Sequence, residues 1–109
     1  MKVRFGEMRW PEIAEALTEP HVVILPVGST EQHGKHLPVD LDTSTPTHYA
    51  EKVAQRVTRE HHVRVLVAPP IPYGEAYGIP PFKKPFPGTI SISLGTSYSP
   101  PVKAKVNKE

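Results

Sequence analysis

The sequence contains no cysteine, which excludes a disulfide framework and any metal site built on thiolates. It also lacks an apolar run long enough to cross a membrane and an apolar core of signal-peptide length, so we expect a cytoplasmic protein without a membrane partner. Basic residues exceed acidic residues by only two, 13 against 11, and they form no stripe interleaved with aromatic residues. Nucleic acid is therefore not an expected partner.

Proline is abundant, with 14 residues in a chain of 109, a length that allows one small domain with a modest core. Seven of the prolines and three glycines fall within residues 69–88, which excludes a helix or a central strand there. Four aromatic residues lie in the same segment: Tyr73, Tyr77, Phe82 and Phe86. We expect a long loop, acting as a lid or as an arm that packs on a neighbouring molecule.

Two helices are expected from proline placement and apolar periodicity. The first runs from Pro11 to Leu17. Its apolar stripe comprises Trp10, Ile13, Ala14 and Leu17. The second runs from about Thr45 to Glu60, with Pro46 in its first turn. Its cap is Thr43, Ser44 or Thr45, and its stripe is Tyr49, Val53 and Val57 with Ala50 and Ala54 beside it.

Strands are expected at residues 22–27, 63–68 and 89–94. The first two are almost continuously apolar, a pattern typical of parallel strands that are covered on both faces. Their order with the second helix predicts a βαβ unit. Residues 95–109 turn polar, and we expect a loosely ordered tail there.

The segment 28–43 concentrates side chains that bind divalent metals: Glu31, His33, His36, Asp40 and Asp42. Gly28 and Gly34 allow positive φ or a close approach of the backbone. A solvated turn would explain the same composition, with Asp42 as a helix cap and Asp40 in water. His36 is more plausible as a loop residue than as a ligand. If the segment does bind metal, zinc, manganese or iron would suit it, including an oxygen-rich dinuclear site.

The run of residues 25–38, LPVGSTEQHGKHLP, followed by Asp42, closely resembles the signature of the creatininase (creatinine amidohydrolase) family. Three further segments, at residues 10–13, 70–74 and 86–91, resemble other parts of that family in the same order. The resemblance covers residues 10 to about 93. It implies a partial three-layer α/β/α fold with a mostly parallel sheet, in which residues 1–94 are the N-terminal part of a truncated creatininase-like domain.

The resemblance also implies a metal-dependent amidohydrolase that cleaves non-peptide, cyclic amide C–N bonds through a metal-bound hydroxide. Glu31 would bind one divalent ion, His33 the other, and Asp42 would bridge them; the ions would be zinc and/or manganese, or iron. His36 is the candidate substrate-binding residue. The family's domain is longer, and a second histidine and a second glutamate that complete its site lie in a half that nothing after Ser93 resembles.

Two hypotheses follow from this partial match. The chain is an amidohydrolase acting on a small-molecule amide, intact only if another chain supplies the other half, or it is an inactive relative that self-associates and binds metal weakly. The expected strands are apolar on both faces, and two helices cannot cover them fully. We therefore expect a homo-oligomer with the 69–88 arm and an exposed sheet face in its interface.

Overall fold

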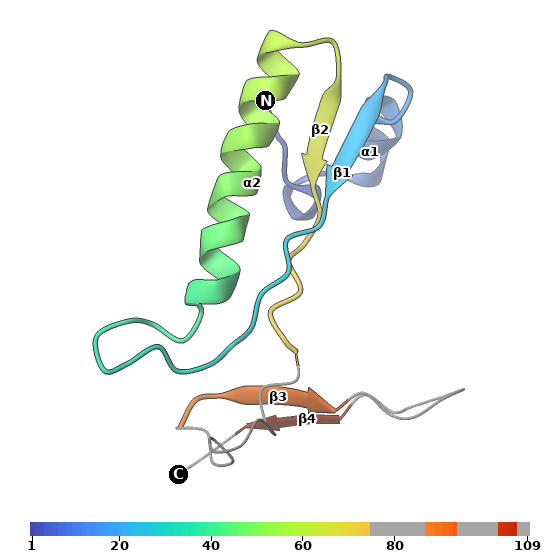
Figure 1. The fold of residues 1–109 in the computed structure, drawn as a ribbon. Coiled ribbons are helices and arrows are strands. Elements are labelled where there is room, and N and C mark those ends of the chain that lie inside the picture. Colours follow the sequence, from blue (N-terminus) through green and yellow to red (C-terminus); the bar gives the residue numbers. More distant parts are fainter. Residues whose placement is uncertain (75–86, 94–102, 107–109) are drawn as a thin grey trace. The chain divides into compact units, whose positions relative to one another are not determined.

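The computed structural model describes residues 1–74, 87–93 and 103–106. The elements in chain order are η1 (Phe5–Glu7), α1 (Trp10–Ala16), β1 (His21–Ile24), α2 (Leu41–Glu60), β2 (Arg64–Val67), β3 (Ile90–Ser93) and β4 (Lys103–Val106) (Figure 1). The chain divides into two compact units, one of residues 1–26 and 45–70, and the other of residues 27–44 and 71–109. Within the described ranges, every helix is too short or too polar to cross a membrane.

The first unit is built on a parallel sheet. β1 and β2 pair in register from His21 opposite Arg64 to Ile24 opposite Val67, and the connection between them includes α2. The predicted parallel strand–helix–strand unit is thus confirmed. On the other edge of β2, the Val67 N–H donates to the carbonyl of Val3 at 2.7 Å. β2 is therefore the central strand of this sheet, and β1 lies at its edge.

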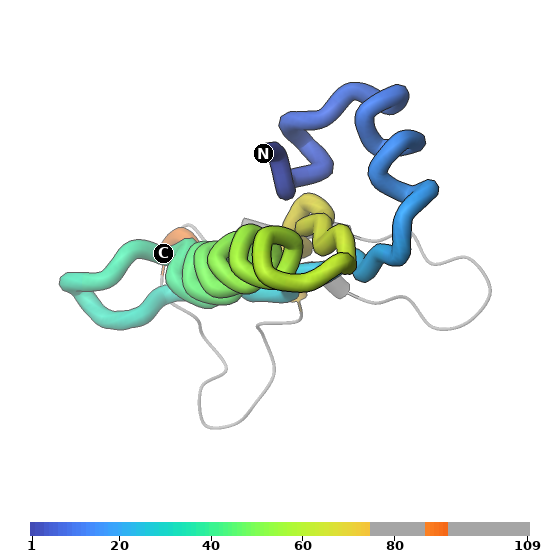
Figure 2. The backbone as a smooth tube through the Cα atoms, turned by 90° about the horizontal axis from the view of Figure 1, so that it is seen from above, coloured from blue at the N-terminus to red at the C-terminus, as the bar shows by residue number. Residues whose placement is uncertain are grey.

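Helices lie on both sides of this sheet, with α1 and α2 on opposite sides of the β1–β2 pair (Figures 1 and 2). Side chains of a strand point alternately to its two faces. On one face Val65 and Val67 form the core with alanines of α2 and with Val3, and on the other Leu66 is fully buried. The architecture is the predicted α/β fold with a parallel sheet, in a partial form.

The expected apolar stripes of the two helices are partly wrong. The residues that the helices bury are alanines: Ala16 in α1, and Ala50 and Ala54 in α2. Trp10 is 80% exposed and Tyr49 is 65% exposed, although both belong to expected stripes. Because alanine has a small side chain, an alanine face lets a helix approach the sheet closely.

β1 also differs from its prediction. It is shorter than the expected 22–27. Val22 is 51% exposed and Val23 is 43% exposed, which agrees with the expectation that two helices cannot fully cover the strands. The cause is its position at the edge of the sheet, where only β2 pairs with it among the described strands. The buried, continuously apolar pattern expected of both strands holds only for β2, whose last three residues are buried.

The second unit contains an antiparallel pair, in which β3 and β4 align from Ile90 opposite Val106 to Ser93 opposite Lys103. β4 lies inside the segment 95–109 that was expected to be loosely ordered, so residues 103–106 depart from that prediction by pairing with β3. The rest of this tail lies outside the described residues, as do residues 75–86 of the proline-rich arm. The predictions of an arm and of a loose tail therefore stay predictions for those ranges.

Candidate metal centre

Residues 28–30, just before the first candidate ligand, are held in place by backbone hydrogen bonds. The Gly28 N–H donates to the carbonyl of Ile71 at 2.8 Å, and the Ile90 N–H donates to the carbonyl of Thr30 at 2.9 Å. The Thr30 hydroxyl donates to the carbonyl of Pro72 at 2.8 Å. Because both edges of this segment are bonded, the position from which Glu31 projects is determined by contacts with residues 71–72 and 90.

The next residues form a turn that returns the chain toward its start. The Glu31 N–H donates to the carbonyl of Val39 at 3.1 Å, which closes the turn. At its tip the Gly34 N–H donates to the side-chain oxygen of Gln32 at 2.9 Å. Gly34 has a φ of +84°, a conformation that a side chain would strain. The positive φ that the sequence analysis allowed at Gly34 is thus present.

α2 begins earlier than the sequence predicts. Its first residue is Leu41, four positions before Thr45, and the carbonyl of Asp40 accepts the N–H groups of Thr43 and Ser44 at 2.9 and 2.8 Å. The predicted cap at Thr43, Ser44 or Thr45 is therefore wrong. The error came from treating Pro46 as a first-turn residue, whereas it lies inside the helix.

The early start of α2 places Asp42 in the first helical turn, where the positive end of the helix dipole favours a carboxylate. Pro46 has no N–H to bond the carbonyl of Asp42, four residues before it. That carbonyl instead lies against Gly28, where a Cβ atom would collide with it and with Thr43, whose Cα would be 2.6 Å away. Gly28 is thus needed for close approach to the helix start, which brings Asp42 toward the turn.

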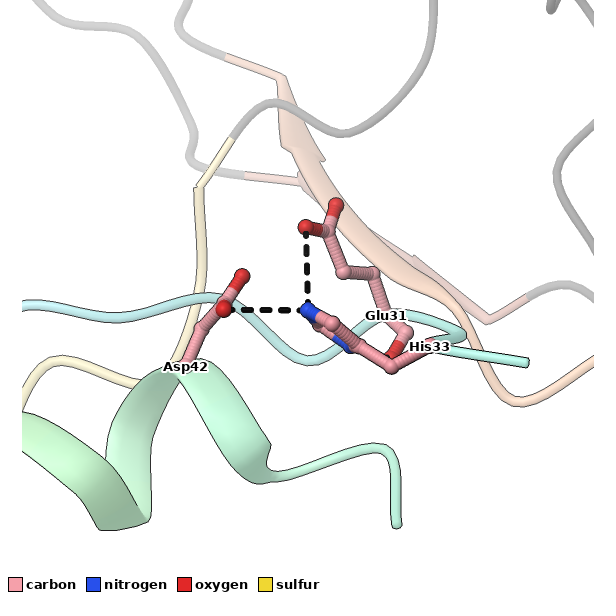
Figure 3. A group of neighbouring side chains, drawn as sticks. All are labelled: Glu31, His33 and Asp42. Carbon is pink, nitrogen blue, oxygen red and sulfur yellow. Dashed lines mark hydrogen bonds and ion pairs between the residues drawn. The ribbon is translucent and has the colours of Figure 1, made fainter. Parts of the chain in front are cut away.

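The three predicted ligands come together. Glu31, His33 and Asp42 each offer a donor atom within 4.8 Å of the others, and all three side chains are partly buried. The Nε2 atom of His33 lies 3.0 Å from Asp42 Oδ1 and 4.0 Å from Glu31 Oε1, so the imidazole points between the two carboxylates (Figure 3). Two carboxylates and one imidazole form a donor set that suits zinc, manganese or iron.

Hydrogen bonds determine how His33 presents its ring. Its Nδ1 atom lies 3.0 Å from the carbonyl of Glu31, which can only accept a hydrogen bond, so Nδ1 carries a proton. Nε2 is therefore the atom that faces the carboxylates. A histidine ligand is commonly oriented in this way, by donating its other ring N–H to a carbonyl. The ring is thus oriented for binding through Nε2.

The pKa values of Glu31 and His33 are both raised. The hydrogen bond to the Glu31 carbonyl raises the pKa of His33, and the nearby charge of Asp42 raises it further. Burial raises the pKa of Glu31, and the adjacent carboxyl of Asp42 adds to the effect by hydrogen bonding and by repulsion. Both shifts favour the protonated forms of these groups, with which a bound cation would compete.

The two other candidates of the segment are not part of the cluster. His36 and Asp40 are exposed, and neither belongs to the group of donor atoms that converge. The assignment of His36 to substrate binding stays a prediction. The sequence analysis also missed Thr89, which is 1% exposed and whose hydroxyl oxygen accepts the Gln32 N–H at 3.3 Å. Thr89 stood only as the first residue of the expected strand 89–94, within a segment that also resembles the family, and neither observation indicated a contact with the turn that carries Glu31 and His33.

Comparison with known proteins places these observations in a family. The creatininase family, described as creatinine amidohydrolase, matches residues 6–99. The chain is 44% identical over 71 residues to a mycofactocin precursor peptide peptidase of Mycolicibacterium smegmatis, covering 65% of this chain and 27% of that protein. It is 34% identical over 93 residues to a creatinine amidohydrolase of Pseudomonas putida, covering 84% and 34%.

Solved structures agree with the sequence comparison. A manganese form of creatininase superposes with a TM-score of 0.67 at 34% identity, covering 85% of this chain and 35% of that one. A mutant creatininase described as a Zn–Zn type gives a TM-score of 0.67 at 33% identity, covering 82% and 33%. The chain thus spans between about a quarter and a third of the length of these two relatives. From the match over residues 6–99 and the shared fold, the chain belongs to the creatininase family.

Proposed function

We propose that this chain takes part in metal-dependent hydrolysis of an amide C–N bond, with Glu31, His33 and Asp42 as metal ligands. The observation that carries the proposal is the convergence of these three donors within 4.8 Å in a chain of the creatininase family. The donors come from two places, the turn after residue 30 and the first turn of α2. Their arrangement therefore depends on the fold and not on sequence proximity alone.

We propose zinc and/or manganese as the ion, with iron as a chemically suitable alternative. Relatives have been solved in manganese and zinc forms, and the oxygen-rich donor set suits these ions. A divalent ion in such a site polarises a carbonyl group and lowers the pKa of bound water. The two carboxylates supply negative charge, and the Nδ1 hydrogen bond of His33 holds Nε2 toward them.

The substrate class is proposed from the names of the relatives. The creatinine amidohydrolase of P. putida supports a non-peptide, cyclic amide as the substrate. The mycobacterial relatives are named as peptide peptidases, which supports a peptide amide as the second candidate. Both reactions cleave an amide C–N bond, so the reaction type is common to the two candidates.

Three donors leave a divalent ion with free coordination positions. We propose that a second polypeptide completes the site and that this chain alone binds metal weakly. The decisive experiment measures manganese and zinc binding by calorimetry, and hydrolysis of creatinine and of short peptides, with and without each ion. Weak ion binding that is lost in His33→Gln supports the metal site, and ion-dependent hydrolysis by this chain alone would show that no second polypeptide is needed. Failure of the chain to bind either ion would overturn it.

A non-enzymatic function is the second candidate, in which the chain self-associates and performs no hydrolysis. The specific observation in its favour is the exposed apolar edge of the first unit, where Val22 and Val23 are about half exposed. We propose a homo-oligomer with this edge in its interface. Light scattering on dilute protein measures the association state of the chain. A monomer that also hydrolyses amides would exclude this alternative.

A further inference from the structure

Thr89 lies far from the metal ligands in the sequence but contacts their turn. Its side chain is almost completely buried, with 1% of its surface exposed. Its hydroxyl oxygen accepts the backbone N–H of Gln32, the residue between Glu31 and His33, at 3.3 Å. A buried threonine hydroxyl is thus directed at the backbone that connects two ligands.

The backbone around Thr89 places this hydroxyl. Gly88, just before it, has a φ of +88°, and the next residue, Ile90, donates its N–H to the carbonyl of Thr30 at 2.9 Å. Residues 30 and 90 also form an antiparallel bridge. The segment 88–90 therefore turns sharply and then pairs with the chain directly before Glu31, which leaves the Thr89 hydroxyl beside Gln32.

In the described part of the chain, the turn of residues 31–39 forms few other hydrogen bonds near Gln32. Glu31 is bonded through its N–H to Val39, and Gly34 is bonded to the Gln32 side chain within the turn itself. Within the described residues, the Thr89 hydroxyl joins the backbone at Gln32 to a segment outside the turn. A shift of this peptide would move Glu31 and His33 relative to each other.

We propose that Thr89 is a positioning residue for the metal centre, acting through its hydroxyl on the Gln32 peptide. The inference rests on the proposed metal-binding function of Glu31, His33 and Asp42. Supporting groups around metal ligands commonly contribute 10- to 100-fold in metal affinity, and we expect a loss of about tenfold when this hydroxyl is removed. Thr89→Val removes the acceptor and keeps the shape, whereas Thr89→Ser keeps the hydroxyl.

A matched control lies in the first unit. The Thr58 hydroxyl accepts the N–H of Val65 at 3.0 Å, the same kind of hydrogen bond, in a unit that contains no ligand residue. Calorimetric titration with Mn²⁺ and with Zn²⁺ should show weaker binding in Thr89→Val and wild-type affinity in Thr89→Ser and Thr58→Val. Thermal melting without metal should show both valine variants destabilised to a similar extent, which separates positioning from general stability.

Hydrogen exchange on the wild-type chain keeps the inference testable if Thr89→Val does not fold. The Gln32 amide should exchange more slowly than that of exposed Lys35 in the same turn, and rapid exchange of Gln32 would overturn the inference. Wild-type metal affinity in folded Thr89→Val would also overturn it and leave the proposed function intact. Absence of metal binding by the wild-type chain would instead overturn the proposed function on which the inference rests.

Discussion

His33 and Asp42 are nine positions apart, yet Nε2 of His33 lies 3.0 Å from Oδ1 of Asp42. The contact joins a turn to the start of α2, and it forms because the helix begins at Leu41. The imidazole points between two carboxylates, a position that would attract a cation (Figure 3).

The carboxylate of Asp42 should be required for metal binding. Asp42→Asn keeps the size of the side chain and removes its charge, and we expect a loss of metal affinity of about tenfold or more. Asp40→Asn makes the same charge change two positions earlier, at an exposed residue outside the cluster. Calorimetry with Mn²⁺ should separate the two variants. Equal affinities in both would show that Asp42 is not a ligand.

Metal binding should strengthen as pH rises through the pKa of His33. Binding requires a neutral imidazole and ionised carboxylates, and the pKa values of His33 and Glu31 are both raised in the folded chain. Affinity measured by calorimetry should therefore fall below the raised pKa of His33, at a higher pH than for an ordinary histidine with a pKa of about 6.5. An affinity independent of pH between about 5 and 8 would contradict this assignment.

The stability of the metal-free chain should change with pH in the opposite direction. A group whose pKa is raised on folding stabilises the folded state below its unfolded pKa, and this stabilisation is lost as pH rises through the folded pKa. For His33 the loss begins near pH 6.5 and ends above its raised pKa. Thermal melting without metal should show the decline, and His33→Gln should reduce it. A decline of equal size in that variant would assign it to other groups.

Gly28 should tolerate no side chain. A Cβ atom at this position would collide with backbone and side-chain atoms of the α2 start, including the carbonyl of Asp42. We expect Gly28→Ala to lower the free energy of unfolding by about 1–3 kcal/mol, the usual range for overpacking, and to weaken metal binding by displacing Asp42. Gly6→Ala is the control, since nothing lies within 4 Å of its new Cβ. Denaturant titration measures both, and equal stabilities would refute the close approach.

The edge of β1 should mediate any self-association. An exposed strand edge invites pairing with another chain, and a lysine there opposes it. Val23→Lys places a charge on this half-exposed strand and should shift a concentration-dependent oligomer toward monomer in light scattering. Gln55→Lys adds the same charge at an exposed position of α2 and should leave the association unchanged. An unaltered oligomer in Val23→Lys would place the interface elsewhere.

The local sequence was sufficient to predict several features. Almost continuously apolar runs identified β1 and β2, and their separation by a helix predicted parallel pairing, because a crossover of this length returns the chain in the same direction. The close spacing of Glu31, His33 and Asp42, read with the family signature, identified the three donors that converge. These predictions succeeded because residue type and spacing act over a few neighbours along the chain.

Tertiary packing decided the features for which neighbours in the sequence carry little information. Pro46 favoured a later start for α2, but the helix begins at Leu41, with its first turn packed against Gly28. The exposure of Val22 follows from the edge position of β1, which depends on the strand order in space. The contact between Thr89 and Gln32 joins residues 57 positions apart. Such contacts depend on how distant segments fill shared space, so the sequence alone identified the candidate ligands and the tertiary structure determined how these side chains are held.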